Sequence, residues 1–390
     1  MRKIKDIDPD VHVGEKLDVE SATQVDNNVL DIECIDYVEL ISGNALQAVY
    51  YYSQAFGFKP VAYRGPKTKF KDDITVVLKQ NDITLLVRSP VTPDNPLNDF
   101  LRKHGDSYRD IAFRVKNCEA FYLETIKRGA ESAETPHVWR DEKGSVKRAA
   151  IKTYGDVIHS IVFRDEYEGL FWPGFVPYED VFPALPDGKT VGLKRIDHVV
   201  GNVEDMNPWV KFYEDVLGFK EMLHFTDQDI STEYSALMSK VVRDGSGKIK
   251  LPINEPATAR RKSQIEEYLE FHLGPGVQHV AFETENIIET VSELRSRGVD
   301  FLYVPETYYQ DVPARVGDIK EDLNTIAKLG ILVDRDNDGY LLQLFTRQVH
   351  QRPTLFYEVI QREGSQGFGV GNFKALFEAL EREQAERGNL

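Results

Sequence analysis

Short β-branched and aromatic runs alternate with amphipathic segments along this chain, and their order repeats. Residues 207–217, NPWVKFYEDVL, place Trp209, Phe212, Tyr213 and Val216 at helical spacing. The segments predicted around this helix are strands at 196–200, 218–225, 232–242, 276–284 and 338–347 and a second helix at 287–299. Strand, helix and then several strands, used twice in each half, predict an α+β protein of four βαβββ modules that pair into two half-open barrels. A doubly wound parallel sheet would need helices between nearly all strands, and the pattern lacks them.

The two halves of the chain are related by an internal repeat. Glu33–Lys59 aligns with Lys194–Lys220 without a gap, and Asp110–Pro136 aligns with His279–Pro305. A looser match sets EGLFWPGF over PTLFYEVI, which places Pro173 on Glu358. The boundary is expected in a Pro/Gly-rich stretch. The predicted organisation is an N-terminal arm at 1–30, an N-terminal domain without metal ligands at 31–175, a linker at 176–192 and a catalytic domain at 193–390.

Three positions matched by the repeat differ in their chemistry. The first half has Tyr37, Asp110 and Pro173, whereas the second has His198, His279 and Glu358. Two histidines and one carboxylate from different strand ends match the facial triad of non-haem Fe(II) enzymes, which leaves half of the coordination sphere open. A carboxylate in the apolar run TLFYEVI is costly unless it is paired or bound to metal. A lone strand histidine is more often a core or surface residue, but three ligand-type residues at matched positions favour a metal site.

Composition narrows the function classes. Of the 390 residues, 41% are hydrophobic and 29% are charged, which is typical of a soluble globular protein. The net charge of −16 argues against nucleic acid as a partner. No apolar run reaches the length of a membrane span, the N-terminus lacks a signal-peptide pattern, and the two cysteines cannot form a disulfide framework. These features predict a cytoplasmic protein.

Several long motifs in the second half carry a specific resemblance. They are LPINEP with KSQIEEYL, GPGVQHVAF, DGYLLQLFT, RPTLFYEVIQR and GFGVGNFKALFEALEREQ. With these motifs the chain resembles the 4-hydroxyphenylpyruvate dioxygenase family, and the first half resembles the family's degenerate N-terminal domain more weakly. The resemblance implies the vicinal oxygen chelate fold, Fe(II), and conversion of 4-hydroxyphenylpyruvate and O₂ to homogentisate and CO₂ in tyrosine breakdown. It also implies a homodimer or homotetramer.

The same resemblance assigns roles to individual residues. It places His198, His279 and Glu358 at the iron-ligand positions. Polar residues implied for the substrate pocket are Ser235, Asn254, Gln264, Gln278 and Gln343, and aromatic ones are Phe345, Phe356, Phe368 and Phe373. The amides of Gln264 and Gln278 are expected at the phenol hydroxyl, and Phe345 and Phe373 are expected to clamp the ring.

The C-terminal segment predicts an amphipathic helix with Phe373, Leu376, Phe377 and Leu380 on one stripe. The glycines before it would permit a hinge, so we expect this helix to close over the iron site as a lid, with an immobile packing helix as the alternative.

Three other functions stay open from the sequence. They are a 4-hydroxymandelate synthase with the same iron and substrate, an extradiol ring-cleaving dioxygenase, and a metal-free binding protein on the same modules. The intact C-terminal motif argues against the extradiol enzyme, and the complete ligand triad argues against the binding protein.

Overall fold

The computed structural model describes residues 14–17, 29–186, 189–227, 231–232, 236–257 and 260–389. The chain divides into two units. The first unit consists of Met1–Lys189, Lys211–Lys220 and Asp244–Ile249. The second consists of Thr190–Val210, Glu221–Arg243 and Lys250–Leu390. None of the helices in the described ranges has both the length and the apolar character needed to cross a membrane.

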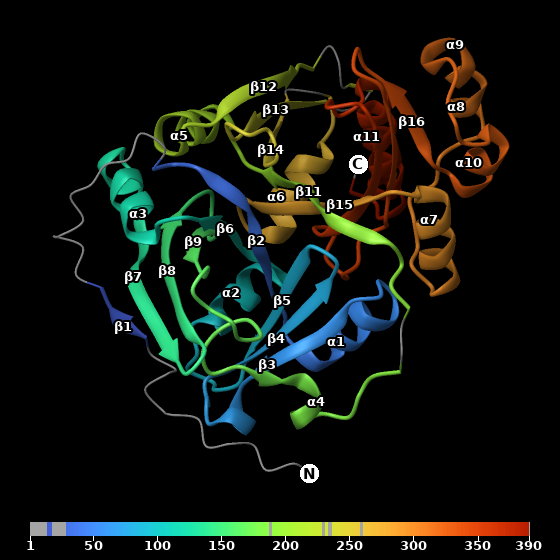
Figure 1. Cartoon of the computed structure of the whole chain (residues 1–390). Coiled ribbons are helices and arrows are strands. Elements are labelled where there is room, and N and C mark those ends of the chain that lie inside the picture. Colours follow the sequence, from blue (N-terminus) through green and yellow to red (C-terminus); the bar gives the residue numbers. More distant parts are fainter. Residues whose placement is uncertain are drawn as a thin grey trace. The chain divides into compact units, whose positions relative to one another are not determined.

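The first unit is built on a sheet of ten strands within its described residues (Figure 1). Its strands, in spatial order, are β1 (Glu15–Lys16), β7 (Ser132–Asp141), β8 (Gly144–Lys152), β9 (Ile158–Phe163), β6 (Ser107–Val115), β2 (Ile32–Ile41), β5 (Ile83–Pro90), β4 (Asp73–Gln80), β3 (Lys59–Arg64) and β10 (Val176–Pro177). Its helices are α1 (Ala45–Gln54), α2 (Leu97–His104), α3 (Cys118–Lys127) and α4 (Tyr178–Val181). The short strand β1 lies within the predicted arm, and β10 and α4 lie within the predicted linker. The predicted domain boundaries stay predictions.

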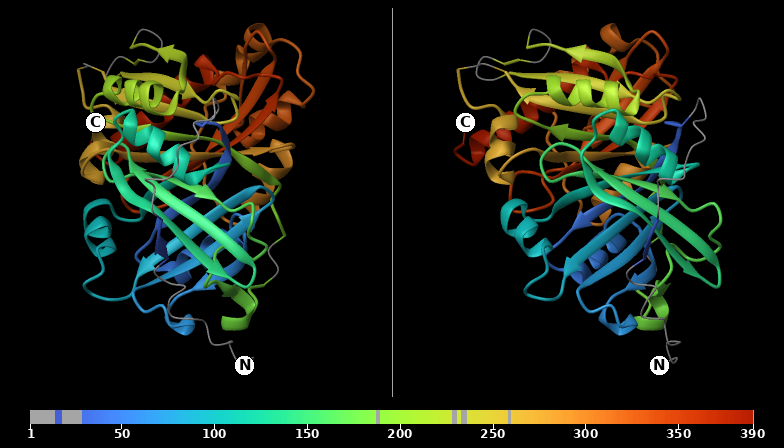
Figure 2. Two further views of the ribbon diagram at one scale, coloured as in Figure 1. Left: turned by 60° about the vertical axis from the view of Figure 1, so that its left-hand side comes forward. Right: turned by 90° about the vertical axis from the view of Figure 1, so that its left-hand side faces the viewer.

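The second unit is built on a sheet of eight strands. In spatial order they are β12 (Lys220–Phe225), β13 (Leu237–Arg243), β14 (Lys250–Pro256), β11 (Leu193–Asn202), β15 (Gly276–Thr284), β18 (Phe356–Glu363), β17 (Tyr340–Phe345) and β16 (Leu332–Arg335). Its helices are α6 (Gln264–His272), α7 (Ile287–Ser296), α8 (Thr307–Gln310), α9 (Val312–Val316), α10 (Leu323–Leu329) and α11 (Val370–Glu386). Helix α5 (Asn207–Leu217) begins in this unit and belongs to the first unit from Lys211 onward. Figure 2 shows each sheet as a curved layer of strands.

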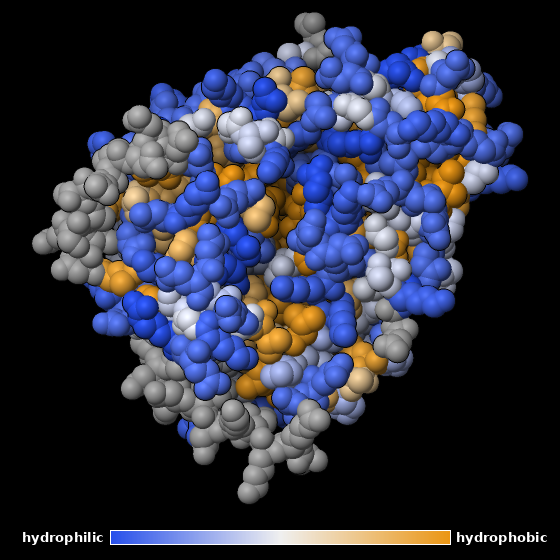
Figure 3. Space-filling model, in the orientation of Figure 1, coloured by the Kyte–Doolittle hydropathy of each residue, from blue (hydrophilic) through white to orange (hydrophobic). Residues whose placement is uncertain are grey.

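The element order confirms the four predicted βαβββ modules. In each unit the first strand of one module pairs antiparallel with the first strand of the next, β2 with β6 and β11 with β15. The first strand also pairs parallel with the last strand of its own module, as β15 does with β18. This is the α+β arrangement expected for the vicinal oxygen chelate fold. The molecular surface drawn in Figure 3 is largely hydrophilic, with smaller apolar areas.

Local sequence explains where the module helices begin and end. Before α7, the side chain of Asn286 accepts a hydrogen bond from the backbone N–H of Glu289 and so caps the helix. Buried Ile287, Val291 and Leu294 then recur at helical spacing, and each such burial contributes about 1.5–3 kcal/mol. The predicted stripe of α11 is also observed, with Leu376, Phe377 and Leu380 buried and Phe373 half-buried.

The strand pairing corrects one part of the repeat. Asp110 on β6 pairs with Ile158 on β9, and His279 on β15 pairs with Phe356 on β18. Because Asp110 and His279 are equivalent, Glu358 corresponds to Ser160. The match of Glu358 with Pro173 is therefore wrong, since it followed a similarity of aromatic residues, whereas backbone pairing determines the register.

The first unit also contains a histidine with a purely internal role. His159 on β9 is fully buried, with Nδ1 2.9 Å from the carbonyl oxygen of Ile111 and Nε2 2.8 Å from the hydroxyl of Tyr213. Its ring stacks on Phe113 at a centroid distance of 4.6 Å. Burial lowers the pKa of His159 to about 4, although the Ile111 carbonyl opposes that shift.

Candidate metal centre

The three predicted metal ligands lie on three neighbouring strands of the second unit. His198 is on β11, His279 on β15 and Glu358 on β18, and each is at least 97% buried. One Glu358 oxygen, Oε2, is 3.1 Å from Nε2 of His198 and 3.3 Å from Nε2 of His279. Among the described residues these side chains form a group whose three possible ligand atoms lie within 4.8 Å of one another.

This spacing fits an octahedral divalent cation. Bonds of about 2.1 Å at right angles place neighbouring ligand atoms about 3 Å apart. The two measured nitrogen-to-oxygen distances, 3.1 and 3.3 Å, agree with that value. The donor set of two imidazoles and one carboxylate also suits a non-haem metal site with open positions.

The charges of the cluster are mutually stabilising. Burial by itself would raise the pKa of Glu358, but His198 and hydrogen bonds from both imidazoles lower the pKa to about 2. The pKa of His198 is raised despite burial, because Glu358 and Asp197 favour its charged form. The pKa of His279 is lowered, chiefly by burial. Glu358 is therefore ionised at neutral pH and available as an anionic ligand.

The Nδ1 atom of each imidazole forms a hydrogen bond with the side chain of the preceding residue. Nδ1 of His198 is 2.7 Å from a carboxylate oxygen of Asp197, and Nδ1 of His279 is 2.9 Å from the amide oxygen of Gln278. Consecutive strand residues normally face opposite sides. Here the β11–β15 pairing skips Asp197 and Gln278, so both are the extra residues of β-bulges. The bulges bring both side chains beside the imidazoles and leave the Nε2 atoms directed at Glu358.

The carboxylate of Glu358 is connected to the C-terminal helix by two hydrogen bonds that run through Gln343. Gln343 on β17 donates from Nε2 to Oε1 of Glu358 at 2.8 Å. Asn372 on α11 donates to the amide oxygen of Gln343, also at 2.8 Å. The start of the helix predicted as a lid is thus two hydrogen bonds from the carboxylate, and whether the helix moves stays a prediction.

Aromatic rings surround the histidines. Phe356 stacks on His279 at 4.6 Å, and Phe345 meets the same imidazole edge-on at 6.1 Å. Phe368 contacts His198 edge-on at 4.8 Å. Phe373 contacts neither imidazole directly but stacks on Phe225 at 5.4 Å, in the cluster that includes Phe368. The four predicted aromatic residues therefore form two groups, Phe345 with Phe356 and Phe368 with Phe373, and the second group also includes Phe225, which was not predicted. The two groups are joined through the rings of His198 and His279, and we refer to them together as the aromatic wall.

The polar residues predicted for the substrate pocket differ in their surroundings. Asn254 on β14 donates to the side-chain oxygen of Asn202 at 3.1 Å, and its own buried Oδ1 has no hydrogen-bond partner among the described residues. Gln264 is the first residue of α6 and lines a cavity of about 10 Å³ together with Gln278 and Phe356. Ser235 lies outside the described residues.

Sequence reasoning missed several residues that contact the site. They are Asp197, Asn202, Phe225, Arg362 and Asn372. A signal for Arg362 was present, because IVFRD in the first half aligns with VIQRE in the second and places Arg164 on Arg362. Asp197 is likewise shared by the repeat, which places Asp36 on it, but nothing in that match indicates its contact with His198. Asn202, Phe225 and Asn372 have no sequence signature, since hydrogen bonds and packing between distant elements create their contacts.

The fold and the ligand cluster define a class of proteins. Residues 195–344 match the family model described as Glyoxalase/Bleomycin resistance protein/Dioxygenase superfamily. Residues 26–171 match the model described as Hydroxyphenylpyruvate dioxygenase, HPPD, N-terminal. The chain is 49% identical to the 4-hydroxyphenylpyruvate dioxygenase of Dictyostelium discoideum, over 92% of this chain and 100% of that protein. It is 43% identical to the enzyme of that name from Yarrowia lipolytica, over 94% of this chain and 96% of that protein. The chain belongs to the 4-hydroxyphenylpyruvate dioxygenase family.

A solved structure gives a second comparison. A mutant 4-hydroxymandelate synthase from Streptomyces coelicolor superposes with a TM-score of 0.80 at 32% sequence identity, covering 90% of this chain and 99% of that one. Members of this family are metal-dependent oxidoreductases, and the cluster of His198, His279 and Glu358 provides a possible metal site here.

Proposed function

We propose that this enzyme converts 4-hydroxyphenylpyruvate and O₂ to homogentisate and CO₂, with Fe(II) held by His198, His279 and Glu358. Both atoms of O₂ enter the products, so the reaction needs no further reductant. The observation that carries the proposal is the convergence of the three ligand atoms beside an aromatic wall, in a chain with the family's sequence over nearly its full length. Bound Fe(II) would supply the electrons that activate O₂ and a template for the 2-oxo acid.

The protein's own residues bind the substrate and exclude water. The rings of Phe345, Phe356 and Phe368 border the imidazoles and offer apolar surface to the phenyl group of the substrate. The buried, unpartnered Oδ1 of Asn254 can accept a hydrogen bond from a substrate hydroxyl. Such an atom is costly to bury without a partner, which supports a polar ligand group at this position.

Turnover under controlled metal conditions tests the proposal. The protein, purified without oxygen and supplied with Fe(II) and ascorbate, should consume O₂ and form homogentisate when 4-hydroxyphenylpyruvate is added. His279→Ala should abolish both metal binding and turnover while the protein stays folded. His104→Ala removes another buried imidazole, hydrogen-bonded to Asp156 in the first unit, and should leave metal binding unchanged. Normal turnover by His279→Ala would refute the ligand assignment.

The alternative product is 4-hydroxymandelate, which the solved relative's name brings into consideration. Homogentisate and 4-hydroxymandelate have the same elemental composition, so chromatography against both standards is needed to separate them. The higher identity to several enzymes named 4-hydroxyphenylpyruvate dioxygenase favours homogentisate. A cytoplasmic location and a homodimeric or homotetrameric state, predicted from the sequence, are part of the same proposal.

A further inference from the structure

A buried aspartate–arginine pair occurs at the same place in both units. In the second unit, Arg362 donates from Nε and Nη2 to the two carboxylate oxygens of Asp197, both at 2.7 Å. In the first unit, Arg164 donates from Nη2 to Asp36 at 2.5 Å. Both carboxylates are nearly inaccessible to solvent, with 1% side-chain exposure. A buried charge pair of this kind persists only when its hydrogen bonds are well satisfied.

The two pairs differ in the residue that comes directly after the aspartate. Both aspartates are bulge residues, because the β2–β6 pairing skips Asp36 as the β11–β15 pairing skips Asp197. Asp197 is followed by His198 and accepts a hydrogen bond from its Nδ1. Asp36 is followed by Tyr37, whose hydroxyl donates to Asp110 instead. The second unit therefore adds an imidazole to an arrangement that the first unit has without one.

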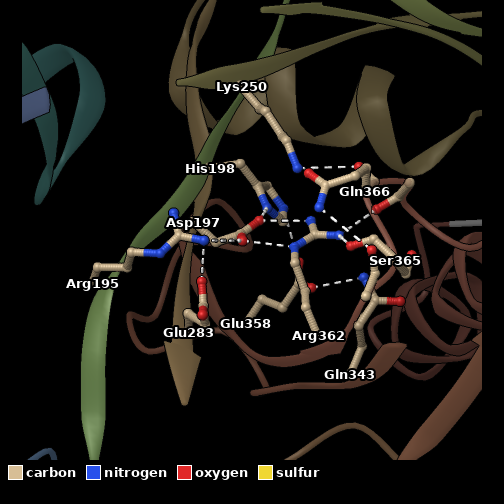
Figure 4. Close-up of polar contacts among 12 residues, drawn as sticks. Arg195, Asp197, His198, Lys250, Glu283, Gln343, Glu358, Arg362, Ser365 and Gln366 are labelled. Carbon is tan, nitrogen blue, oxygen red and sulfur yellow. Dashed lines mark hydrogen bonds and ion pairs between the residues drawn. The ribbon is translucent and has the colours of Figure 1, made fainter. Parts of the chain in front are cut away.

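Arg362 also holds the segment that carries part of the aromatic wall. Its Nη1 donates to the carbonyl oxygens of Gly367, at 2.6 Å, and Ser365, at 3.3 Å. Figure 4 shows its guanidinium between Asp197 and the backbone at Ser365. The guanidinium carbon lies 5.6 Å from the ring centre of Phe368, which in turn contacts His198.

Lys250 strengthens the attachment of this segment. Its Nζ donates to the carbonyl oxygen of Gln366 at 3.1 Å (Figure 4). The same atom lies 5.9 Å from the ring centre of Phe368. Residues 365–368 are thus held at three consecutive carbonyl groups by two cations that come from β14 and β18.

We propose that Asp197 and Arg362 are positioning residues for the metal centre, and this inference rests on the proposed function. Asp197 accepts a hydrogen bond from the Nδ1–H group of His198, which keeps the proton on Nδ1 and leaves the lone pair of Nε2 available to the metal. Arg362 joins that carboxylate to the backbone beside Phe368, so that the proposed ligand His198 and the ring of Phe368 are both held by the same guanidinium group. Hydrogen bonding to an anionic partner also makes the ligating imidazole more basic.

The alternative is that the pair only stabilises the fold, as its counterpart does in the first unit. That counterpart supplies a matched control. Asp197→Asn and Asp36→Asn make the same isosteric change at equivalent bulges, and each removes the charge of a buried carboxylate. Asp36 also accepts a hydrogen bond from Nε of Arg114 at 2.8 Å, so its replacement should affect stability at least as strongly. Only the first change alters the partner of a proposed ligand.

The experiment measures metal binding separately from activity. Co(II) is titrated into the metal-free proteins, and its visible spectrum reports the ligand geometry. Asp197→Asn should weaken Co(II) binding by about 10- to 100-fold and shift the spectrum, whereas Asp36→Asn should lower the melting temperature with Co(II) affinity unchanged. Arg362→Lys keeps the charge but loses the planar fork, so it should raise KM for 4-hydroxyphenylpyruvate more than it lowers kcat.

The outcomes separate this inference from the function on which it rests. A wild-type protein that binds no metal would refute the proposed function and this inference together. A functional wild type beside an Asp197→Asn variant with unchanged Co(II) affinity and spectrum would overturn the inference alone. Equal losses of Co(II) affinity in the two aspartate variants would also overturn it, because the effect would then come from folding.

Discussion

The three first-unit positions that correspond to the proposed metal ligands form a hydrogen-bonded cluster of their own. Asp110 is completely buried and accepts hydrogen bonds from the hydroxyl of Tyr37 at 3.0 Å and from the hydroxyl and backbone N–H of Ser160 at 2.5 and 2.9 Å. Arg148 lies 3.6 Å from the same carboxylate. The first unit thus satisfies a buried charge with internal donors, where the second unit has candidate metal ligands.

Tyr37→Phe tests this interpretation with the loss of a single hydroxyl group. A hydrogen bond to a charged group is worth about 1.5–3 kcal/mol, and Asp110 keeps its other donors, so we expect a loss of about 2 kcal/mol. For a unit of this size, each kcal/mol lowers the melting temperature by about 2–4 °C, which gives a decrease of about 4–8 °C. Fe(II) affinity and the rate of homogentisate formation should not change.

Differential scanning calorimetry and Fe(II) titration of the same protein samples measure both quantities. Ser160→Ala is a companion variant that removes a different donor to Asp110 and should give a shift of similar size. A Tyr37→Phe protein with an unchanged melting temperature would show that the cluster contributes no stability. Loss of Fe(II) binding in that variant would show that the first unit takes part in the metal site, which would contradict an internal role for the cluster.

Three further predictions concern acid stability, the carboxylate ligand and a glycine turn. Because the pKa of His159 falls from 6.5 to about 4 on folding, the unfolded chain binds a proton that the folded chain does not, so lowering the pH from 6.5 to 4 should cost about 3 kcal/mol of unfolding free energy. Urea titrations across that range should show a smaller pH dependence for His159→Gln, and an identical slope would contradict the assignment. Gln343→Leu removes the donor to Glu358 and should weaken Fe(II) binding by about 10-fold in a competition titration, so wild-type affinity would count against this second contact. Gly144 has φ of +117°, and a Cβ there would lie 1.8 Å from the backbone oxygen of Glu166, so Gly144→Ala should destabilise the first unit by about 3 kcal/mol or more, and a thermal melt like that of wild type would refute the clash.

Two consecutive hydrogen bonds connect the helix predicted as a lid, α11, with the proposed metal ligand Glu358. Asn372 at the start of α11 contacts Gln343, which contacts Glu358. If α11 moves during turnover, this pair of hydrogen bonds is where the movement would reach the carboxylate. Removal of residues 370–390 should therefore leave metal binding largely intact but uncouple O₂ consumption from homogentisate formation. Normal homogentisate yield after that truncation would exclude a lid.

The sequence by itself determined the modules and the three candidate ligands. Hydrophobic spacing located α5, α7 and α11, because the apolar side chains of a helix must face one side to be buried together. The repeat matched His198 to Tyr37 and His279 to Asp110, because those segments align without gaps and strand pairing keeps the same offsets. Long motifs in the second half indicated the family for the same reason, since they are continuous in the chain.

Tertiary structure alone decided the partners of those residues. Ser160 was established as the counterpart of Glu358 by the backbone pairing between β6 and β9, because the aromatic residues around Pro173 had suggested a different register. Asp197 reached the imidazole of His198 because a β-bulge turned it out of strand alternation. Arg362, 165 positions further along the chain, completed that support. A sequence records which residues are present, but hydrogen bonds depend on direction and distance, and these exist only after distant strands have paired.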